Sequence, residues 1–132
     1  MTYRINIISN EIIFLTLIKK FVEKIELDIQ VSQTESLNVL YKEMKDNYYD
    51  LIIVDGNFSE NSAIDLIHTI RFKLKTFTPI WFFTVIQTPE YYKKALQVGA
   101  NVIIERPFDP IEIASQIHGF LTKKVTEKNW KI

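Results

Sequence analysis

The sequence predicts an α/β domain in which helices cover both faces of a doubly wound, five-stranded parallel sheet. Short apolar runs rich in isoleucine and valine alternate along the chain with longer segments whose apolar residues recur every three or four positions. The first pattern is typical of strands buried on both faces, and the second is typical of amphipathic helices. Repeated alternation within 132 residues indicates a single domain, because parallel strands are joined by helical crossovers.

The first half of the chain is predicted to contain three strands and two helices. Residues 5–8 form an isoleucine-rich strand, and residues 11–25 follow with apolar side chains at helical spacing. Residues 27–31 fit a second strand at the edge of the sheet. Thr34 is the expected N-cap of the second helix, since its hydroxyl can accept a bond from a backbone N–H of the first turn. Residues 51–54 carry the strongest strand signal and precede loop-forming residues.

The second half continues the alternation. Residues 62–71 have a third helical pattern, and residues 79–83 form a fourth strand with proline at its first position. The fourth helix is predicted to begin at Pro89 and to end at Gly99. Proline suits the first turn of a helix, and glycine suits the residue just past its end. Residues 101–104 complete the predicted sheet.

The last helix is predicted to open at Asp109 and Pro110. We expect the domain to span residues 1–123, because the apolar helical spacing stops before that point. Residues 124–132 are polar and rich in lysine, so we expect them to form a C-terminal tail or the start of a linker.

The composition indicates which kinds of partner and which cellular location to expect. Sixteen Lys and Arg balance sixteen Asp and Glu, so bulk charge indicates no nucleic-acid partner and no anionic membrane surface. Zero net charge gives little electrostatic repulsion between copies, which makes a homodimer possible. The chain has no cysteine, no signal-peptide pattern and no apolar run of the length that a membrane span needs. We therefore expect a cytoplasmic protein.

Polar residues of complementary chemistry follow the predicted strands. Asp55 follows the third strand, Thr84 the fourth and Arg106 the fifth. Because the carboxyl ends of parallel strands lie at one edge of a sheet, these side chains are expected to converge. A carboxylate flanked by a hydroxyl and a guanidinium is a plausible acceptor of a phosphoryl group, with the acid as nucleophile and the other groups stabilising the phosphoryl oxygens.

Three segments in this order resemble the receiver domain of bacterial response regulators. They are residues 50–55 with the helix at 63–71, residues 78–84, and residues 99–109, which include Glu105-Arg106-Pro107-Phe108. The resemblance covers nearly the whole chain to about residue 123. It implies a flavodoxin-like sheet of strand order 2-1-3-4-5 with five helices, and a signalling module rather than an enzyme. A flavin or nucleotide enzyme is disfavoured, because no phosphate-binding loop follows the first strand.

The resemblance also assigns roles to single residues. Asp55 is implied to be the phosphorylation site, and Thr84 the hydroxyl that moves toward the phosphoryl group. Arg106 stands where the family has a lysine, and its bond to Pro107 is implied to be cis. Ile103 stands at the position of the family's switch aromatic.

The acidic pocket that holds magnesium in this family is degenerate here. The positions of the two acids after the first strand are Ser9 and Asn10, with Glu11 one step further. The remaining candidate ligands are Asp55 and the backbone carbonyl of Asn57. Because Mg²⁺ requires hard oxygen ligands that usually include carboxylates, its binding is predicted to be possible but weak.

Two functions remain open at this point. In the first, a histidine kinase phosphorylates Asp55, and the change is relayed to a partner face that the resemblance places near Tyr91, Tyr92, Ile103 and Ile104. In the second, the chain is a pseudo-receiver that acts through contact with another signalling protein, without phosphorylation. In that case Arg106 could form an ion pair with Asp55 and supply the missing positive charge internally.

Overall fold

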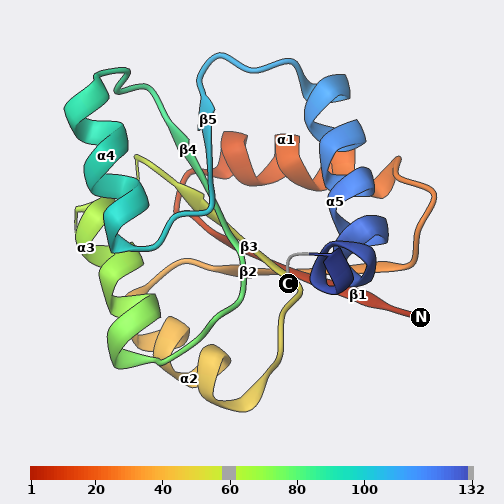
Figure 1. The fold of residues 1–132 in the computed structure, drawn as a ribbon, viewed down its shortest axis with the longest axis horizontal. Coiled ribbons are helices and arrows are strands. Elements are labelled where there is room, and N and C mark those ends of the chain that lie inside the picture. The colour runs from red at the N-terminus through yellow and green to blue at the C-terminus, as the bar shows by residue number, and fades with distance from the viewer. Residues whose placement is uncertain (58–61, 131–132) are drawn as a thin grey trace.

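The computed structural model describes residues 1–57 and 62–130, and gives only the backbone of residues 37 and 124–130. Strands and helices alternate along the chain (Figure 1). The strands are β1 (Tyr3–Ile8), β2 (Ile29–Thr34), β3 (Leu51–Asp55), β4 (Ile80–Thr84) and β5 (Val102–Glu105). The helices are α1 (Ile12–Glu23), α2 (Leu37–Asp46), α3 (Ala63–His68), α4 (Pro89–Val98) and α5 (Pro110–Trp130), and a π-helical turn, η1 (Thr69–Lys73), follows α3.

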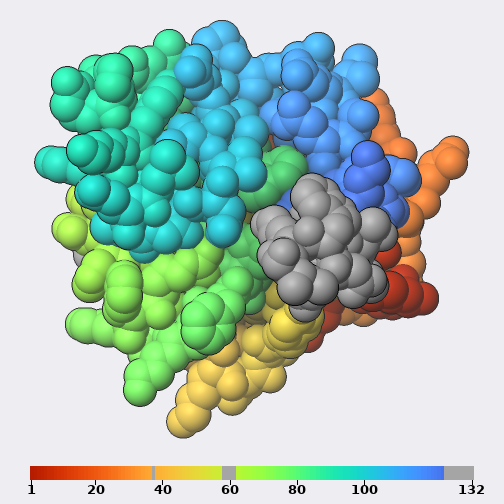
Figure 2. Space-filling view, viewed as in Figure 1, coloured from red at the N-terminus to blue at the C-terminus, as the bar shows by residue number. Residues whose placement is uncertain are grey.

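The five strands form one parallel sheet in the order β2-β1-β3-β4-β5, which confirms the predicted fold class. Helices α1 and α5 cover one face, while α2, α3 and α4 cover the other (Figure 1). Helices α3 and α4 lie side by side at one side of the molecule (Figure 2). The predicted start of α4 at Pro89 and its end at Gly99 are confirmed, and Gly99 adopts the positive φ of 121° that favours glycine.

The core consists of two apolar clusters separated by the sheet. Every residue of β3 and β4 is buried. Along β3, Leu51 and Ile53 pack in the cluster beneath α1 and α5, whereas Ile52 and Val54 pack in the cluster beneath α2, α3 and α4. This alternation follows from the two-residue repeat of a strand. It explains why strands buried on both faces are continuous apolar runs in the sequence.

The expected N-cap at Thr34 is wrong. Thr34 is the last residue of β2, where it pairs with Ile8 and donates its hydroxyl to Asn6 Oδ1 at 3.0 Å. Because β2 pairs with the whole length of β1, it spans Ile29–Thr34 rather than the predicted residues 27–31. The N-cap of α2 is Ser36, whose hydroxyl accepts a bond from Val39 N–H. Propensity alone could not separate the two residues, because both serine and threonine are good caps.

The helix predicted over residues 62–71 is α3 followed by the π-helical turn η1. Arg71, within that turn, donates to the carbonyl oxygens of Thr76, Thr78 and Gly99 and to Asn101 Oδ1. These bonds tie the turn to the end of α4. The backbone of α5 is helical as far as Trp130, and residues 131 and 132 lie outside the described part, so the division at residue 123 stays a prediction. None of the helices within the described ranges is long and apolar enough to cross a membrane.

Candidate functional site

Three of the predicted site residues meet at the carboxyl edge of the sheet, around Asp55. This residue ends β3 and is fully buried. Its Oδ2 atom accepts the hydroxyl of Ser9 at 2.6 Å, which reaches it from the residue after β1. Its Oδ1 atom accepts Nη2 of Arg106 at 2.6 Å, from the residue after β5. Oδ1 also accepts the backbone N–H of Asn57 at 2.9 Å. Both carboxylate oxygens are therefore engaged by groups of the protein itself.

The guanidinium of Arg106 lies over an aromatic ring as it reaches Asp55. Its Cζ atom is 4.2 Å from the centre of the Phe14 ring on α1, a distance at which a guanidinium interacts favourably with the ring face. The Arg106 side chain is only 12% exposed, and its Nη1 is 4.0 Å from a carboxylate oxygen of the more exposed Glu11. The Nε atom is buried and has no hydrogen-bond partner among the described residues. Arg106 thus forms a buried ion pair with Asp55, and its guanidinium lies against the Phe14 ring.

Phe14 was not identified as a site residue from the sequence. The position has the apolar spacing of α1, which indicates a core residue, and Phe14 does pack edge-on against Phe83 at 5.4 Å between ring centres. Phe83 packs in the same way against Phe108 at 5.1 Å. The Phe14 ring that lies against the guanidinium is therefore held in place by two further aromatic rings. No local signal in the sequence separates a core phenylalanine from one that also supports a cation.

Gly56 allows β3 to end close to β4. Its backbone N–H donates to Phe83 O at 2.7 Å. A Cβ atom at this position would lie 2.4 Å from the same oxygen, which is far closer than real Cβ atoms approach. The sequence indicated only a loop-forming residue here. Glycine is therefore needed directly after Asp55, because a side chain at this position would collide with β4.

Thr84 is buried at the end of β4, one strand away from Asp55. Its hydroxyl accepts the backbone N–H of Ile86 at 3.0 Å. Its carbonyl oxygen accepts the backbone N–H of Arg106 at 2.9 Å, so Thr84 contacts the site through the main chain. The Arg106–Pro107 bond is cis, as predicted.

Comparison with known proteins identifies this arrangement. A profile of the response regulator receiver domain matches residues 5–118. The chain belongs to the response regulator receiver domain family. The receiver is 23% identical over 120 residues to the transcriptional regulatory protein CrdR of Helicobacter pylori, and 26% identical over 106 residues to the autoinducer 2 sensor kinase/phosphatase LuxQ of Vibrio vulnificus. These matches cover 91% and 79% of the receiver, but only 55% of CrdR and 12% of LuxQ.

Solved structures share the same fold. A two-component response regulator from Clostridium difficile has a TM-score of 0.81 at 21% identity, covering 92% of the receiver and 98% of that chain. The orphan response regulator HP1043 of Helicobacter pylori has a TM-score of 0.72 at 21% identity, covering 89% of the receiver and 94% of that chain. The CheY-like receiver protein from Methanospirillum hungatei has a TM-score of 0.78 at 18% identity, covering 96% of the receiver and 99% of that chain. The resemblance seen in the sequence is thus confirmed at the level of family and fold.

Receiver domains generally bind Mg²⁺ at the phosphorylation site, but the residues of this receiver do not fit that ion. Ser9 and Asn10 carry no charge, and the Ser9 hydroxyl both donates to Asp55 and accepts the N–H of Glu11 at 3.0 Å. Among the side chains that the structure describes, no three His, Cys, Asp or Glu residues come together as a metal site. The Arg106 guanidinium already contacts one of the two Asp55 carboxylate oxygens. A second positive charge beside it would be repelled.

The four residues expected near a partner face differ in how exposed their side chains are. Tyr92 is partly exposed on α4 and donates its hydroxyl to Glu105 at 2.6 Å. Tyr91 packs against Phe82, and Ile103 lies partly buried against the same cluster. Ile104 is only 9% exposed in the cluster beneath α5, so its side chain offers little area to a partner. Alternation along β5 turns neighbouring side chains to opposite faces of the sheet.

Proposed function

We propose that this receiver signals through contact with a partner protein, and that the Asp55–Arg106 ion pair sets its conformation without Mg²⁺-dependent phosphorylation. One observation carries the proposal. Asp55 is fully buried, and its two oxygens are occupied by the Ser9 hydroxyl, the Asn57 N–H and the Arg106 guanidinium. A nucleophilic carboxylate needs an oxygen free to approach phosphorus, and the phosphoryl oxygens need a compensating cation close by.

A second candidate function is the acceptance of a phosphoryl group on Asp55. It is favoured by the same acid, with a guanidinium and the buried Thr84 hydroxyl at one edge of the sheet. Attack through Oδ1 requires Arg106 to leave that atom, which would break a buried ion pair and move the guanidinium off Phe14. Both movements oppose modification, because separating a buried pair leaves a charge without compensation.

Exposure to a small phosphodonor separates the two functions. The receiver is incubated with acetyl phosphate and Mg²⁺, or with beryllofluoride and Mg²⁺, and followed by intact mass and by ¹H–¹⁵N spectra. We expect no phosphoryl adduct and no shifts around residue 55. A receiver with acids at both magnesium positions shows that the reagents are active, and Asp55→Asn shows whether any adduct is specific. An adduct that Asp55→Asn abolishes would refute the proposal in favour of the second function.

A variant that restores the acidic pair and the lysine typical of the family tests the proposal by gain of function. The triple variant Ser9→Asp, Asn10→Asp, Arg106→Lys supplies two carboxylates and a compact cation in place of the planar guanidinium. We expect this variant to bind Mg²⁺ and to gain the phosphoryl adduct that the unaltered receiver lacks. Titration with Mg²⁺, monitored by the spectra of residues near Asp55, measures the first effect.

Receiver domains interact with histidine kinases and other signalling proteins, so we propose a partner of this kind. The chain spans about half the length of CrdR and about an eighth of LuxQ, so the output of any larger protein stays a proposal. The cytoplasmic location, the possible homodimer and the absence of nucleic-acid and membrane partners remain predictions from composition.

A further inference from the structure

A row of polar side chains lies between α2 and the sheet. Along β1, Ile5 and Ile7 pack in the cluster beneath α1 and α5, so the alternation of a strand turns Asn6 toward α2. Asn6 is fully buried. Its neighbours on β2 are Ser32, directly opposite, and Thr34, which is also fully buried. Buried polar groups are costly unless they are hydrogen-bonded, so these positions require partners.

The polar side chains form one continuous chain of hydrogen bonds that ends on α2. The Thr34 hydroxyl donates to Asn6 Oδ1 at 3.0 Å, and Asn6 Nδ2 donates to the Ser32 hydroxyl at 3.2 Å. Ser32 donates to the Tyr49 hydroxyl at 3.3 Å, and Tyr49 donates to Glu43 Oε2 at 2.7 Å. We call these five residues the polar network. Because every donor in it points toward the Glu43 carboxylate, the bonds strengthen one another.

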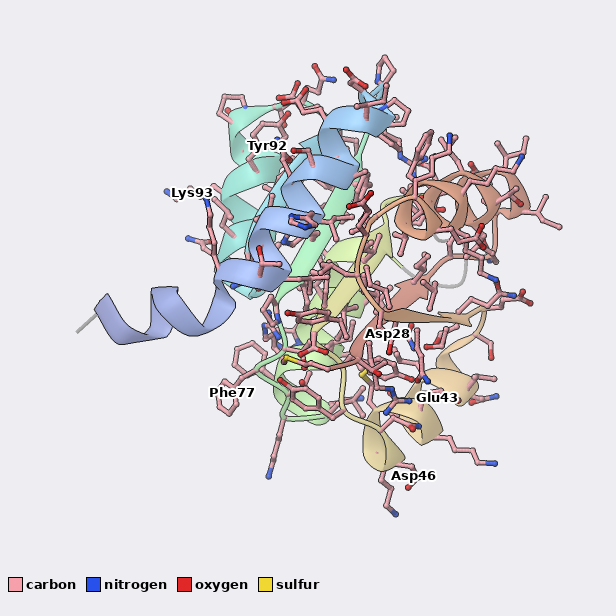
Figure 3. All side chains as sticks on the ribbon, turned by 90° about the vertical axis from the view of Figure 1, so that its right-hand side faces the viewer. Asp28, Glu43, Asp46, Phe77, Tyr92 and Lys93 are labelled. Atoms are coloured by element: carbon pink, nitrogen blue, oxygen red, sulfur yellow. The ribbon has the colours of Figure 1, made fainter. Side chains whose placement is uncertain are left out.

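Glu43 anchors a helix that buries little apolar surface. Among the α2 side chains that the structure describes, only Leu40 is buried. Val39 and Tyr41 are 45% and 40% exposed. Figure 3 shows Glu43 on the side of α2 near the strands, whereas Asp46 lies at the end of the helix, farther from them. The attachment of α2 to the sheet therefore depends on the polar network as well as on apolar packing.

The opposite end of the polar network reaches the site through the backbone of Thr34. Its carbonyl oxygen accepts the Ser9 N–H at 3.1 Å, and the Ser9 hydroxyl donates to Asp55 at 2.6 Å. The same hydroxyl accepts the Glu11 N–H at 3.0 Å, which fixes its direction. Ser36, the N-cap of α2, follows two residues after Thr34, so a displacement of α2 also moves the end of β2.

We propose that Thr34 and Asn6 are positioning residues for the site. They hold the end of β2, so that Ser9 keeps its hydroxyl on Asp55. While α2 is docked, Glu43 anchors the polar network, and the Thr34 carbonyl oxygen stays on Ser9. When α2 leaves the sheet, the end of β2 loosens and Ser9 turns away from Asp55. This inference goes beyond the proposed function, and it does not depend on whether Asp55 accepts a phosphoryl group.

The variants Thr34→Val and Thr34→Ser test the positioning role in the intact chain. Valine has nearly the shape of threonine but no hydroxyl, whereas serine keeps the hydroxyl. Hydrogen exchange of the Ser9 and Glu11 amides reports the bonds around Ser9, and the ¹³Cγ shift of Asp55 reports the acceptor. We expect Thr34→Val to speed exchange of both amides about threefold to tenfold and to move the Asp55 signal toward its position in Ser9→Ala. Thr34→Ser should restore the rates and the signal of the unaltered receiver.

The double variant Thr34→Val with Ser9→Ala separates a positioning role from a general loss of stability. If Thr34 acts through Ser9, the Asp55 signal of the double variant matches that of Ser9→Ala alone. A further shift in the double variant, unchanged exchange at Ser9, or equal acceleration of the β4 amides would refute the positioning role. Should Thr34→Val fail to fold, Ser32→Ala interrupts the polar network at a half-buried position, and the same outcomes decide.

The variant Tyr49→Phe tests the anchor on α2. It keeps the ring but removes the hydroxyl that accepts from Ser32 and donates to Glu43. We expect exchange of the α2 amides to speed about threefold or more, with a smaller acceleration at Ser9. The matched control is Tyr41→Phe, at an exposed position of α2, which should leave both rates unchanged. Faster exchange in α2 without any change at Ser9 would refute the link between α2 and the site.

Discussion

The replacement Arg106→Met tests how much the internal cation contributes to the stability of the receiver. Methionine has a similar length and can stay on the Phe14 ring, so the change removes mainly charge and hydrogen bonding. It leaves Asp55 fully buried with the Ser9 hydroxyl and the Asn57 N–H as its remaining donors. The experiment therefore isolates the cost of an uncompensated carboxylate.

The structure sets the size of the effect. Removing one partner of a buried ion pair costs about 3–5 kcal/mol. Because two donors to Asp55 remain, we expect the lower end, about 3 kcal/mol. For a domain of this size the urea dependence is about 1.5–2 kcal/mol per M, so the midpoint should fall by about 1.5–2 M. Adding Asp55→Asn removes the buried charge, and the double variant should regain about half of the loss.

Urea unfolding at pH 7, followed by far-UV circular dichroism, measures the loss. Lys20→Met is the matched control, because it removes one positive charge from an exposed position of α1. It should change stability by less than about 0.5 kcal/mol. A loss below about 1 kcal/mol for Arg106→Met, or no recovery in the double variant, would contradict a structural role for the ion pair.

Three further outcomes follow from the contacts around the site and α4. Gly56→Ala places a Cβ atom 2.4 Å from Phe83 O, and we expect a loss of about 2–3 kcal/mol in thermal unfolding. Arg71→Met removes donors to four oxygens around the end of α4 and should cost about 2–3 kcal/mol by urea unfolding. The hydrogen bond to Glu105, with burial and charge, raises the pKa of Tyr92 from 10.0 to about 12. The folded state therefore keeps this proton longer than the unfolded chain, so the stability that it provides is complete below about pH 10 and is lost as the pH rises toward 12.

Each of these has a matched comparison. Tyr92→Phe should flatten the fall of unfolding free energy above about pH 10, and an unchanged slope would contradict the assigned bond. Gly119→Ala is the control for Gly56→Ala, because a Cβ atom there meets nothing within 4 Å. Equal losses in the two glycine variants would contradict the steric argument. Arg71→Lys keeps the charge but not the planar fork, so full stability in that variant would show that the geometry of the bonds is unimportant.

The order of apolar patterns along the chain was sufficient to predict the architecture and the polar residues of the site. Alternating apolar runs and helical patterns identify the strands and helices because each element must bury one stripe or both faces. Asp55, Thr84 and Arg106 could be placed together because each lies at the end of its own strand, and parallel strands end at one edge. That inference needs no side-chain coordinates. The hydroxyl that binds Asp55 belongs to Ser9 rather than to Thr84. The segments around Asp55, Thr84 and Arg106 then indicated the family.

The tertiary structure alone decided what these residues do to one another. Whether Arg106 turns to solvent or lies on Phe14 and binds Asp55 depends on a ring from a distant helix and on the register of three strands. The end of β2 at Thr34 likewise depends on the length of β1, its neighbour. These contacts join residues far apart in the chain, and their energies appear only once the sheet has brought them together. The sequence by itself therefore determined which polar groups gather at this edge of the sheet, whereas the packing decided which of them bind Asp55 and that Arg106 forms an ion pair with it.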